Sequence, residues 1–116
     1  MKKEQRICKN HEFSSIIQGR NVCKSASFVL YHQNRELEHA RVGISVGKKI
    51  GNAVMRNKVK RQVRSMVDSI FDFTENYDAI LIVRPFFRKK TYQENLDDLK
   101  RLKNRVNQKY KGKGAQ

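Results

Sequence analysis

Cationic side chains at helical spacing in the middle of the chain are the residues best suited to chemistry with a charged partner. Residues 56–64 read RNKVKRQVR, and no acidic residue occurs between Glu38 and Asp68. At about 100° per residue, one helix face collects Asn57, Lys60, Arg61 and Arg64, flanked by Arg56 and Lys58. Like charges at this spacing cost an isolated helix about 0.2–0.5 kcal/mol per pair. The face therefore indicates a polyanionic partner, and a solvated basic surface is the alternative.

Two further cations lie just before this stretch. Lys48 and Lys49 end an alternating segment, and Asn52 is a preferred helix N-cap residue. The first turn of a helix presents unpaired N–H groups and the positive end of the dipole, which favour phosphate. Lys48 and Lys49 are thus candidates for a second anion contact, or simply two exposed lysines at a strand end.

The surrounding periodicities predict the elements that hold these cations. Within residues 41–48, valine and isoleucine alternate with glycine and serine, and this period of two predicts a strand. After Asn52 the apolar residues recur every three or four positions, as one face of a helix requires. This stripe consists of Met55, Val59, Val63, Met66 and Ile70.

The N-terminal part predicts one helix and one strand. Asn10 can cap a short helix that carries Phe13, Ile16 and Ile17 and stops at Gly19. Residues 25–32 predict a strand whose two faces are both partly apolar, so that one face could line a groove. The simplest pairing of this strand with residues 41–48 is an antiparallel hairpin with a long loop.

The C-terminal part predicts a buried strand and a long helix. Residues 77–84 form a nearly continuous apolar run, closed by Pro85, which is typical of a strand buried on both faces. Residues 86–90 then predict a loop with two aromatics and three cations. Thr91 and Glu94 form a capping box, and the helix stripe that follows is Leu96, Leu99, Leu102 and Val106.

These elements predict an α+β fold with the order α-β-β-α-β-α, a small mixed sheet packed with helices. The third strand, reached through the central helix, should run parallel to its neighbour. The general rule for such a crossover predicts a right-handed connection.

Length and charge restrict the class of protein. The 116 residues predict one domain over residues 1–116, with a flexible basic arm at about 1–9 and a flexible tail at about 111–116. The net charge of +15, from 26 Lys and Arg against 11 Asp and Glu, points to nucleic acid or an anionic membrane surface. No apolar run is long enough to span a bilayer and no signal peptide is evident, so we expect a cytoplasmic protein.

Catalytic constellations are missing from the sequence. The acids are scattered, no common hydrolase or nucleotide-binding motif occurs, and two Cys with three His do not match zinc-ligand spacing. A helix-turn-helix would need a second helix where a strand is predicted, and a membrane-surface helix would not need the strands. RNA binding fits best, because a cationic helix and aromatic platforms at Phe13 and Tyr31 can grip phosphates and unpaired bases.

The central block resembles a known family. Residues 56–64 resemble the Arg-Asn signature helix of the bacterial ribonuclease P protein subunit, and residues 41–54 are similar to that family's strand and turn. The similarity extends more weakly to Phe13, residues 28–31 and residues 77–85. The resemblance implies a ribosomal protein S5 domain 2-like fold with a left-handed βαβ crossover, against the general rule, and we follow the resemblance.

The resemblance also implies a function. The protein would bind the catalytic ribonuclease P RNA and the 5′ leader of precursor tRNA, promoting endonucleolytic 5′ maturation of tRNA. The RNA subunit would carry the chemistry with magnesium that it mainly binds itself, and no obligate protein partner or membrane is expected. The charge alone leaves a general structured-RNA-binding or ribosome-associated protein as the alternative. Whether any protein group ligates a metal stays open.

Site residues follow by matching position. The resemblance implies that Lys48, Lys49, Arg56, Asn57, Lys58, Lys60, Arg61 and Arg64 face RNA. Phe13, Ile17 and Tyr31 would line a cleft for the single-stranded leader. The family often has an aromatic residue where this chain has Ile17, and an aliphatic side chain stacks less well on a base.

Overall fold

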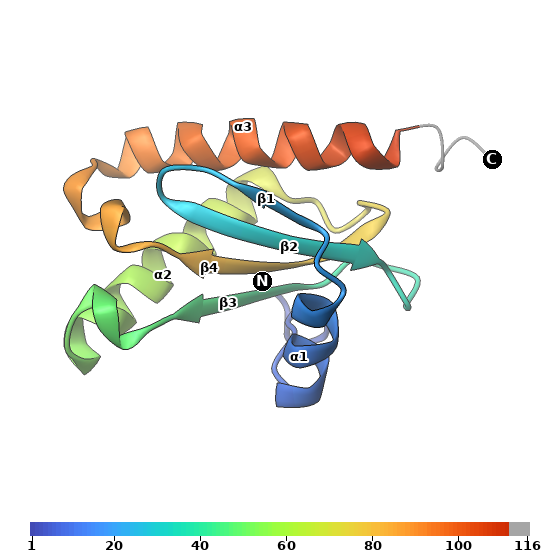
Figure 1. The fold of residues 1–116 in the computed structure, drawn as a ribbon, viewed down its shortest axis with the longest axis horizontal. Helices are drawn as coiled ribbons and strands as arrows, with labels where there is room; N and C mark the ends of the chain where they lie inside the picture. Colours follow the sequence, from blue (N-terminus) through green and yellow to red (C-terminus); the bar gives the residue numbers. More distant parts are fainter. Residues whose placement is uncertain (112–116) are drawn as a thin grey trace.

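The computed structural model describes residues 1–111, so residues 112–116 of the tail expected at about 111–116 lie outside the described residues. Figure 1 shows the elements in sequence colours. The helices are α1 (Asn10–Gln18), α2 (Ala53–Ile70) and α3 (Tyr92–Tyr110). The strands are β1 (Val22–Lys24), β2 (Phe28–Asn34), β3 (Val42–Val46) and β4 (Tyr77–Val83). Three 3₁₀ turns are η1 (Lys3–Gln5), η2 (Lys48–Ile50) and η3 (Pro85–Lys89).

The four strands form one mixed sheet in the order β1-β2-β4-β3. β4 lies between β2, which is antiparallel to it, and β3, which is parallel to it. The predicted hairpin of residues 25–32 with residues 41–48 is therefore wrong. β4 separates the two strands because its nearly continuous apolar run is buried on both faces and needs a neighbour on each side. The first partner of β2 is instead β1, a three-residue strand that the pattern did not predict.

The connection from β3 through α2 to β4 is left-handed. In Figure 1, α2 passes behind the sheet, β3 points to the left, and its parallel partner β4 lies above it. The rule that most such crossovers are right-handed fails here. The α+β class and the handedness implied by the resemblance are confirmed.

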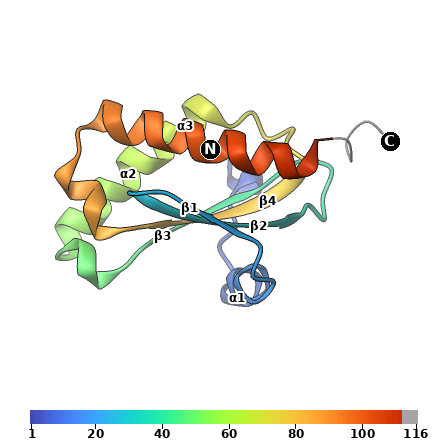
Figure 2. The same ribbon diagram turned by 45° about the horizontal axis from the view of Figure 1, so that its top comes forward.

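The two faces of the sheet carry different layers. Figure 2 shows α2 and α3 above the sheet and α1 below it. The main core lies between the sheet and α2 with α3. Val67 of α2, which the stripe did not include, is fully buried, whereas the predicted Met55, Ile70 and Leu96 are only partly buried. The other predicted stripe residues are buried as expected. From the helices these are Val59, Val63, Met66, Leu99, Leu102 and Val106.

The second face of the sheet holds α1 through a small apolar cluster and a buried ion pair. Phe13 packs with Ile7, Ile16 and Ile80. A Cβ atom at Gly43 in β3 would lie 2.7 Å from the Phe13 Cζ and 2.8 Å from the Ile80 Cδ1. The Phe13 ring therefore occupies the space that a side chain at position 43 would need.

The ion pair joins three elements. The Arg41 guanidinium is 2.7 Å from the Glu12 carboxylate of α1 and 3.4 Å from the Asp78 carboxylate of β4. The Arg41 backbone N–H also donates to the Asp78 Oδ1 at 2.9 Å. The Arg41 side chain is 11% exposed and that of Asp78 is fully buried, so this pairing fixes α1 to the sheet in a water-poor position.

The N-terminal segment, for which we expected flexibility, lies along the β3 edge of the sheet. Arg6 forms a parallel bridge with Val42, and the Ile7 N–H donates to the Val42 carbonyl at 3.1 Å. Ile7 is buried. The segment thereby covers the free edge of β3, and its mobility stays a prediction.

A buried histidine predicts how stability depends on pH. His32 of β2 is 4% exposed, and its Nδ1 lies 2.7 Å from the Tyr110 hydroxyl. Burial, assisted by the Lys109 charge, lowers the pKa of His32 to about 4. The unfolded chain takes up this proton near pH 6.5, so the stabilisation is complete above that pH and is lost as pH falls toward 4. We expect acidification from pH 7 to pH 5 to lower the free energy of unfolding by about 1–2 kcal/mol through this group.

Urea unfolding at a series of pH values measures this loss. The His32→Gln variant, which keeps a polar side chain but does not titrate, is the matched control and should show a flatter profile between pH 7 and pH 5. Parallel profiles for the two proteins would show that His32 is not the titrating group.

Candidate nucleic-acid interface

The N-terminus of α2 is built as the sequence predicts. The Asn52 side chain accepts a hydrogen bond from the Met55 backbone N–H at 2.9 Å, which caps the helix. The apolar stripe turns toward the sheet, so the cationic residues must turn away from it. No acidic residue occurs in the first turn, and Lys48 and Lys49 are exposed in η2 just before it.

The cationic face of α2 is free to meet a partner. Asn57, Lys58, Arg61 and Arg64 are exposed, while Arg56 and Lys60 are half-buried. Within residues 1–111, none of the five cations on α2 forms an ion pair with an acidic residue. Internal ion pairs of Arg61 and Arg64 would have contradicted the predicted face. Neither residue forms one within the described part of the chain. No acidic side chain within residues 1–111 therefore compensates these charges.

One flank of this face continues into a hollow that reaches α1. The hollow has a volume of about 240 Å³ at the β3 edge of the sheet. Lys60 and Arg64 line it from α2 and Phe13 lines it from α1. Its other lining residues are Met1, Arg6, Ile7, Cys8, Val42 and Ile44. The structure thus brings an aromatic ring and two cations, predicted separately, to the same place.

The other predicted cleft residues lie near Phe13 but outside this hollow. Tyr31 is half-buried on the same face of the sheet and packs on the cluster that holds Phe13. Ile17 is half-buried one helical turn after Phe13 on α1. Val29 and Ile82 are also half-buried, and neither was predicted as a cleft residue. Strand alternation places Val29 on the same face as Tyr31, because it lies two positions before it.

Magnesium does not fit the predicted RNA-facing residues. Magnesium prefers oxygen ligands such as carboxylates, whereas this face offers cations and one amide. Across the described part of the chain, no group of three or more His, Cys, Asp or Glu side chains could hold a metal ion.

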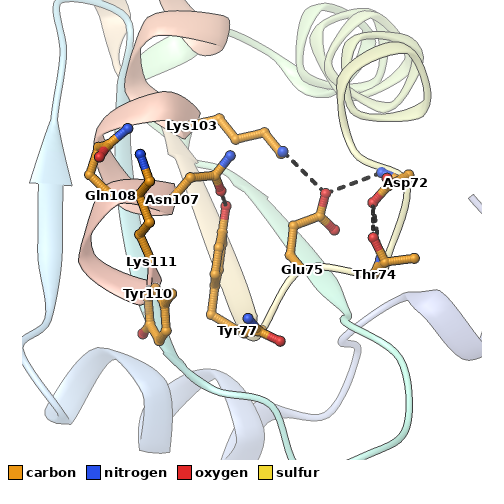
Figure 3. A pocket seen from close by; sticks show the side chains of 10 residues that line it. Asp72, Thr74, Glu75, Tyr77, Lys103, Asn107, Gln108, Tyr110 and Lys111 are labelled. Carbon is orange, nitrogen blue, oxygen red and sulfur yellow. Dashed lines mark hydrogen bonds and ion pairs between the residues drawn. The ribbon is translucent and has the colours of Figure 1, made fainter. Parts of the chain in front are cut away.

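A larger hollow lies elsewhere, between the segment leading into β4 and the C-terminal half of α3 (Figure 3). Its volume is about 520 Å³ and its lining is mostly polar. The Glu75 carboxylate accepts from the Lys103 ammonium at 3.1 Å and from the Asp72 backbone N–H at 3.2 Å. These contacts tie the segment to α3. No predicted site residue lines this hollow.

Comparison with known proteins decides the family. The family model described as Ribonuclease P matches residues 1–107 of the chain. The chain belongs to the ribonuclease P protein family. Two curated members show how close the relation is. The Ribonuclease P protein component of Mesoplasma florum is 40% identical over 104 residues, 88% of this chain and 94% of the relative. That of Streptococcus pyogenes serotype M5 is 42% identical over 94 residues, 81% of this chain and 79% of the relative.

Solved structures of the ribonuclease P protein family share the fold. The RNase P protein of Staphylococcus aureus has a TM-score of 0.80 at 34% identity, covering 88% of this chain and 94% of that one. The RNase P protein from Thermotoga maritima has a TM-score of 0.69 at 24% identity, over 83% and 96% of the two chains, and supports the fold alone. Among residues 1–111 of this family member, every helix falls short of what crossing a membrane requires.

Proposed function

We propose that this chain is the protein subunit of ribonuclease P. It binds the RNA subunit and the 5′ leader of precursor tRNA, in the cytoplasm, and promotes endonucleolytic maturation of the tRNA 5′ end. The observation that carries the proposal is the unpaired cationic face of α2, whose Lys60 and Arg64 share a hollow with Phe13. Phosphates and an unpaired base can be bound together at such a place.

The proposed role of the protein is electrostatic. The RNA subunit and precursor tRNA are both polyanions, so their phosphates repel one another when the substrate docks. Arg61 and Arg64 are exposed and carry charge that can offset this repulsion. The RNA subunit carries out the hydrolysis with magnesium that it mainly binds itself, so no protein side chain is needed as nucleophile or general base.

The leader is proposed to cross the sheet face beside α1. Phe13, Ile17 and Tyr31 are all half-buried there, so each keeps some surface for a ligand. Phe13 lies nearest the cations because it lines the same hollow as Lys60 and Arg64. A strand of RNA could thus have its bases against apolar side chains and its phosphates toward α2.

Reconstitution tests the proposed function. The purified chain, added to a bacterial ribonuclease P RNA, should raise cleavage of precursor tRNA at low magnesium concentration. An unrelated structured RNA at the same salt concentration is the binding control, because a general RNA-binding protein would bind both with similar affinity. Absence of stimulation would overturn the proposal, and cleavage by the protein without RNA would show that the protein itself carries an active site.

The leader cleft predicts a substrate-specific effect. Tyr31→Ala should weaken holoenzyme binding of precursor tRNA with a long leader by about 1–3 kcal/mol if the ring stacks on a base. It should leave the affinity for leaderless tRNA unchanged. Tyr31→Phe keeps the ring and is the matched control, expected to behave as the unaltered protein. Equal losses for both substrates would place Tyr31 outside the cleft.

A further inference from the structure

The flank of α2 opposite the leader hollow forms a second hollow with η3. Its volume is about 230 Å³. Lys58 and Gln62 line it from α2, while Arg88 and Lys90 line it from η3 and the residue that follows. Met55, Val59, Phe87, Tyr92 and Asn95 complete the lining. The two hollows share no lining residue, so the basic face of α2 is divided between two surfaces.

Three hydrogen bonds position Arg88 and the turn that carries it. The Arg88 guanidinium donates to the Ile50 carbonyl at 2.9 Å, which joins η3 to η2. The buried Asn95 amide donates to the Phe87 carbonyl at 2.9 Å. The Tyr92 hydroxyl donates to the Ser65 hydroxyl of α2 at 3.0 Å. The turn is therefore positioned before any partner arrives, which lowers the entropic cost of binding.

The charge of this hollow is of one sign. Three cations line it and no acidic residue does. The Lys90 ammonium lies 3.9 Å from Glu94, and both side chains are well exposed, so the pair is weak. Lys90 also borders an adjoining hollow that is lined by Glu94, Asp97 and Asp98. Lys89 adds a further exposed cation on η3. Such a cluster raises the local concentration of a polyanion and repels cationic partners.

Two exposed aromatic residues border the cations. Tyr92 of α3 lines the hollow and is 40% exposed. Phe86 of η3 is 38% exposed, lines the adjoining hollow, and has the Lys90 ammonium 5.2 Å from its ring centroid. A cation beside an aromatic ring is the combination that binds both the phosphates and the sugar or base surfaces of RNA. A docking site for an acidic peptide would gain little from rings placed at the rim.

We infer that the surface formed by Lys58, Arg88, Lys89 and Lys90 binds phosphates of the RNA subunit, while the Lys60 and Arg64 flank serves the substrate leader. This inference rests on the proposed function and deepens it, because it assigns the two flanks of α2 to two different RNAs. The two hollows lie on opposite sides of one helix, so both RNAs can be held at once. The 3₁₀ turn, predicted only as a basic loop, becomes a binding element.

The test compares two double variants with equal loss of charge. Lys58→Ala with Lys90→Ala removes two exposed cations of the η3 hollow, and Lys100→Ala with Lys109→Ala removes two exposed cations of α3. Affinity for the ribonuclease P RNA is measured over a series of salt concentrations. For the first variant we expect about tenfold weaker binding and a log–log salt slope smaller by about 1.4–1.8, since each phosphate contact contributes about 0.7–0.9. The second variant should have a much smaller effect on both the affinity and the salt slope.

A second readout separates the two flanks. The ratio of holoenzyme affinities for precursor tRNA and leaderless tRNA should be unchanged in the Lys58 and Lys90 variant, because the leader lies on the other flank. Lys58→Arg with Lys90→Arg restores the charges and should restore the salt slope. Equal salt slopes for the two alanine double variants would overturn the inference, and so would a loss of leader discrimination.

Failure of the proposed function gives a different result. In that case the unaltered protein does not stimulate the ribonuclease P RNA. The salt slopes of the same variants on an unrelated structured RNA would then still decide whether the η3 hollow binds phosphates, and equal slopes there would reject it. A stimulating protein whose variants have equal slopes rejects the inference alone.

Discussion

Replacing Asp78 with alanine is expected to lower the free energy of unfolding by about 3–5 kcal/mol, the cost of breaking a buried ion pair on one side. Asp78 is fully buried and accepts from both the backbone and the guanidinium of Arg41. Without it, the 11% exposed Arg41 side chain keeps only Glu12 as a charged partner. Because α1 is fixed through this pairing, the loss should also weaken leader binding. Urea unfolding at pH 7.5 measures the stability.

Asp78→Asn provides the informative comparison. Burial raises the pKa of Asp78 even though Arg41 opposes this shift, so the carboxylate charge itself is costly at this position. Asparagine can still accept the Arg41 N–H, and its cost should be only about 1–3 kcal/mol. Glu38→Ala, at an exposed acid in the β2–β3 connection, controls for loss of negative charge. A loss below 1 kcal/mol for Asp78→Ala would show that the ion pair does not hold α1.

The double replacement Arg61→Ala with Arg64→Ala is expected to have the largest effect on RNA binding. Both side chains are exposed, and neither has an acidic partner within residues 1–111. At about 1.5–3 kcal/mol for a hydrogen bond to a charged group, the loss of even one phosphate contact predicts at least about tenfold weaker binding. The log–log salt slope should fall by about 0.7–0.9 for each phosphate contact that is lost.

Filter binding or fluorescence anisotropy with the ribonuclease P RNA measures the contribution of Arg61, and the same measurement on the holoenzyme with precursor tRNA measures that of Arg64, which lies on the leader flank. The unfolding free energy should stay within about 0.5 kcal/mol of the unaltered protein, because exposed side chains without internal partners are replaced. Lys100→Ala with Lys109→Ala again controls for net charge. An unchanged salt slope would show that Arg61 and Arg64 are solvated surface residues that do not contact RNA phosphates.

Local features of the fold could be predicted from the sequence, and strand pairing could not. The Asn52 cap and the Val59–Val63–Met66 stripe depend on neighbours within one or two turns, so the pattern contains them. The strand that pairs with β2 is β4, which follows about forty residues later in the sequence. The local pattern around β2 contains no information about so distant a strand. The three residues of β1 were too few to show a period.

The candidate site divides in the same way. The helical wheel places Lys58 and Lys60 on α2, but it does not show that η3 lies beside one and α1 beside the other. The sequence pattern identified Arg41 only as a residue of a predicted strand. Its pairing with Glu12 and Asp78 needs three elements to meet. The roles of the predicted RNA-facing and cleft residues stay predictions until binding is measured.

The Phe13 ring lying over Gly43 links these two positions in evolution. Any side chain at position 43 would meet the ring tip within 3 Å, so it would force the aromatic group out of the hollow. A chain that acquires a larger residue at one position should carry a smaller one at the other. These two positions are thirty residues apart in the sequence. Correlated substitutions at them among orthologues would reveal the contact without any structure determination.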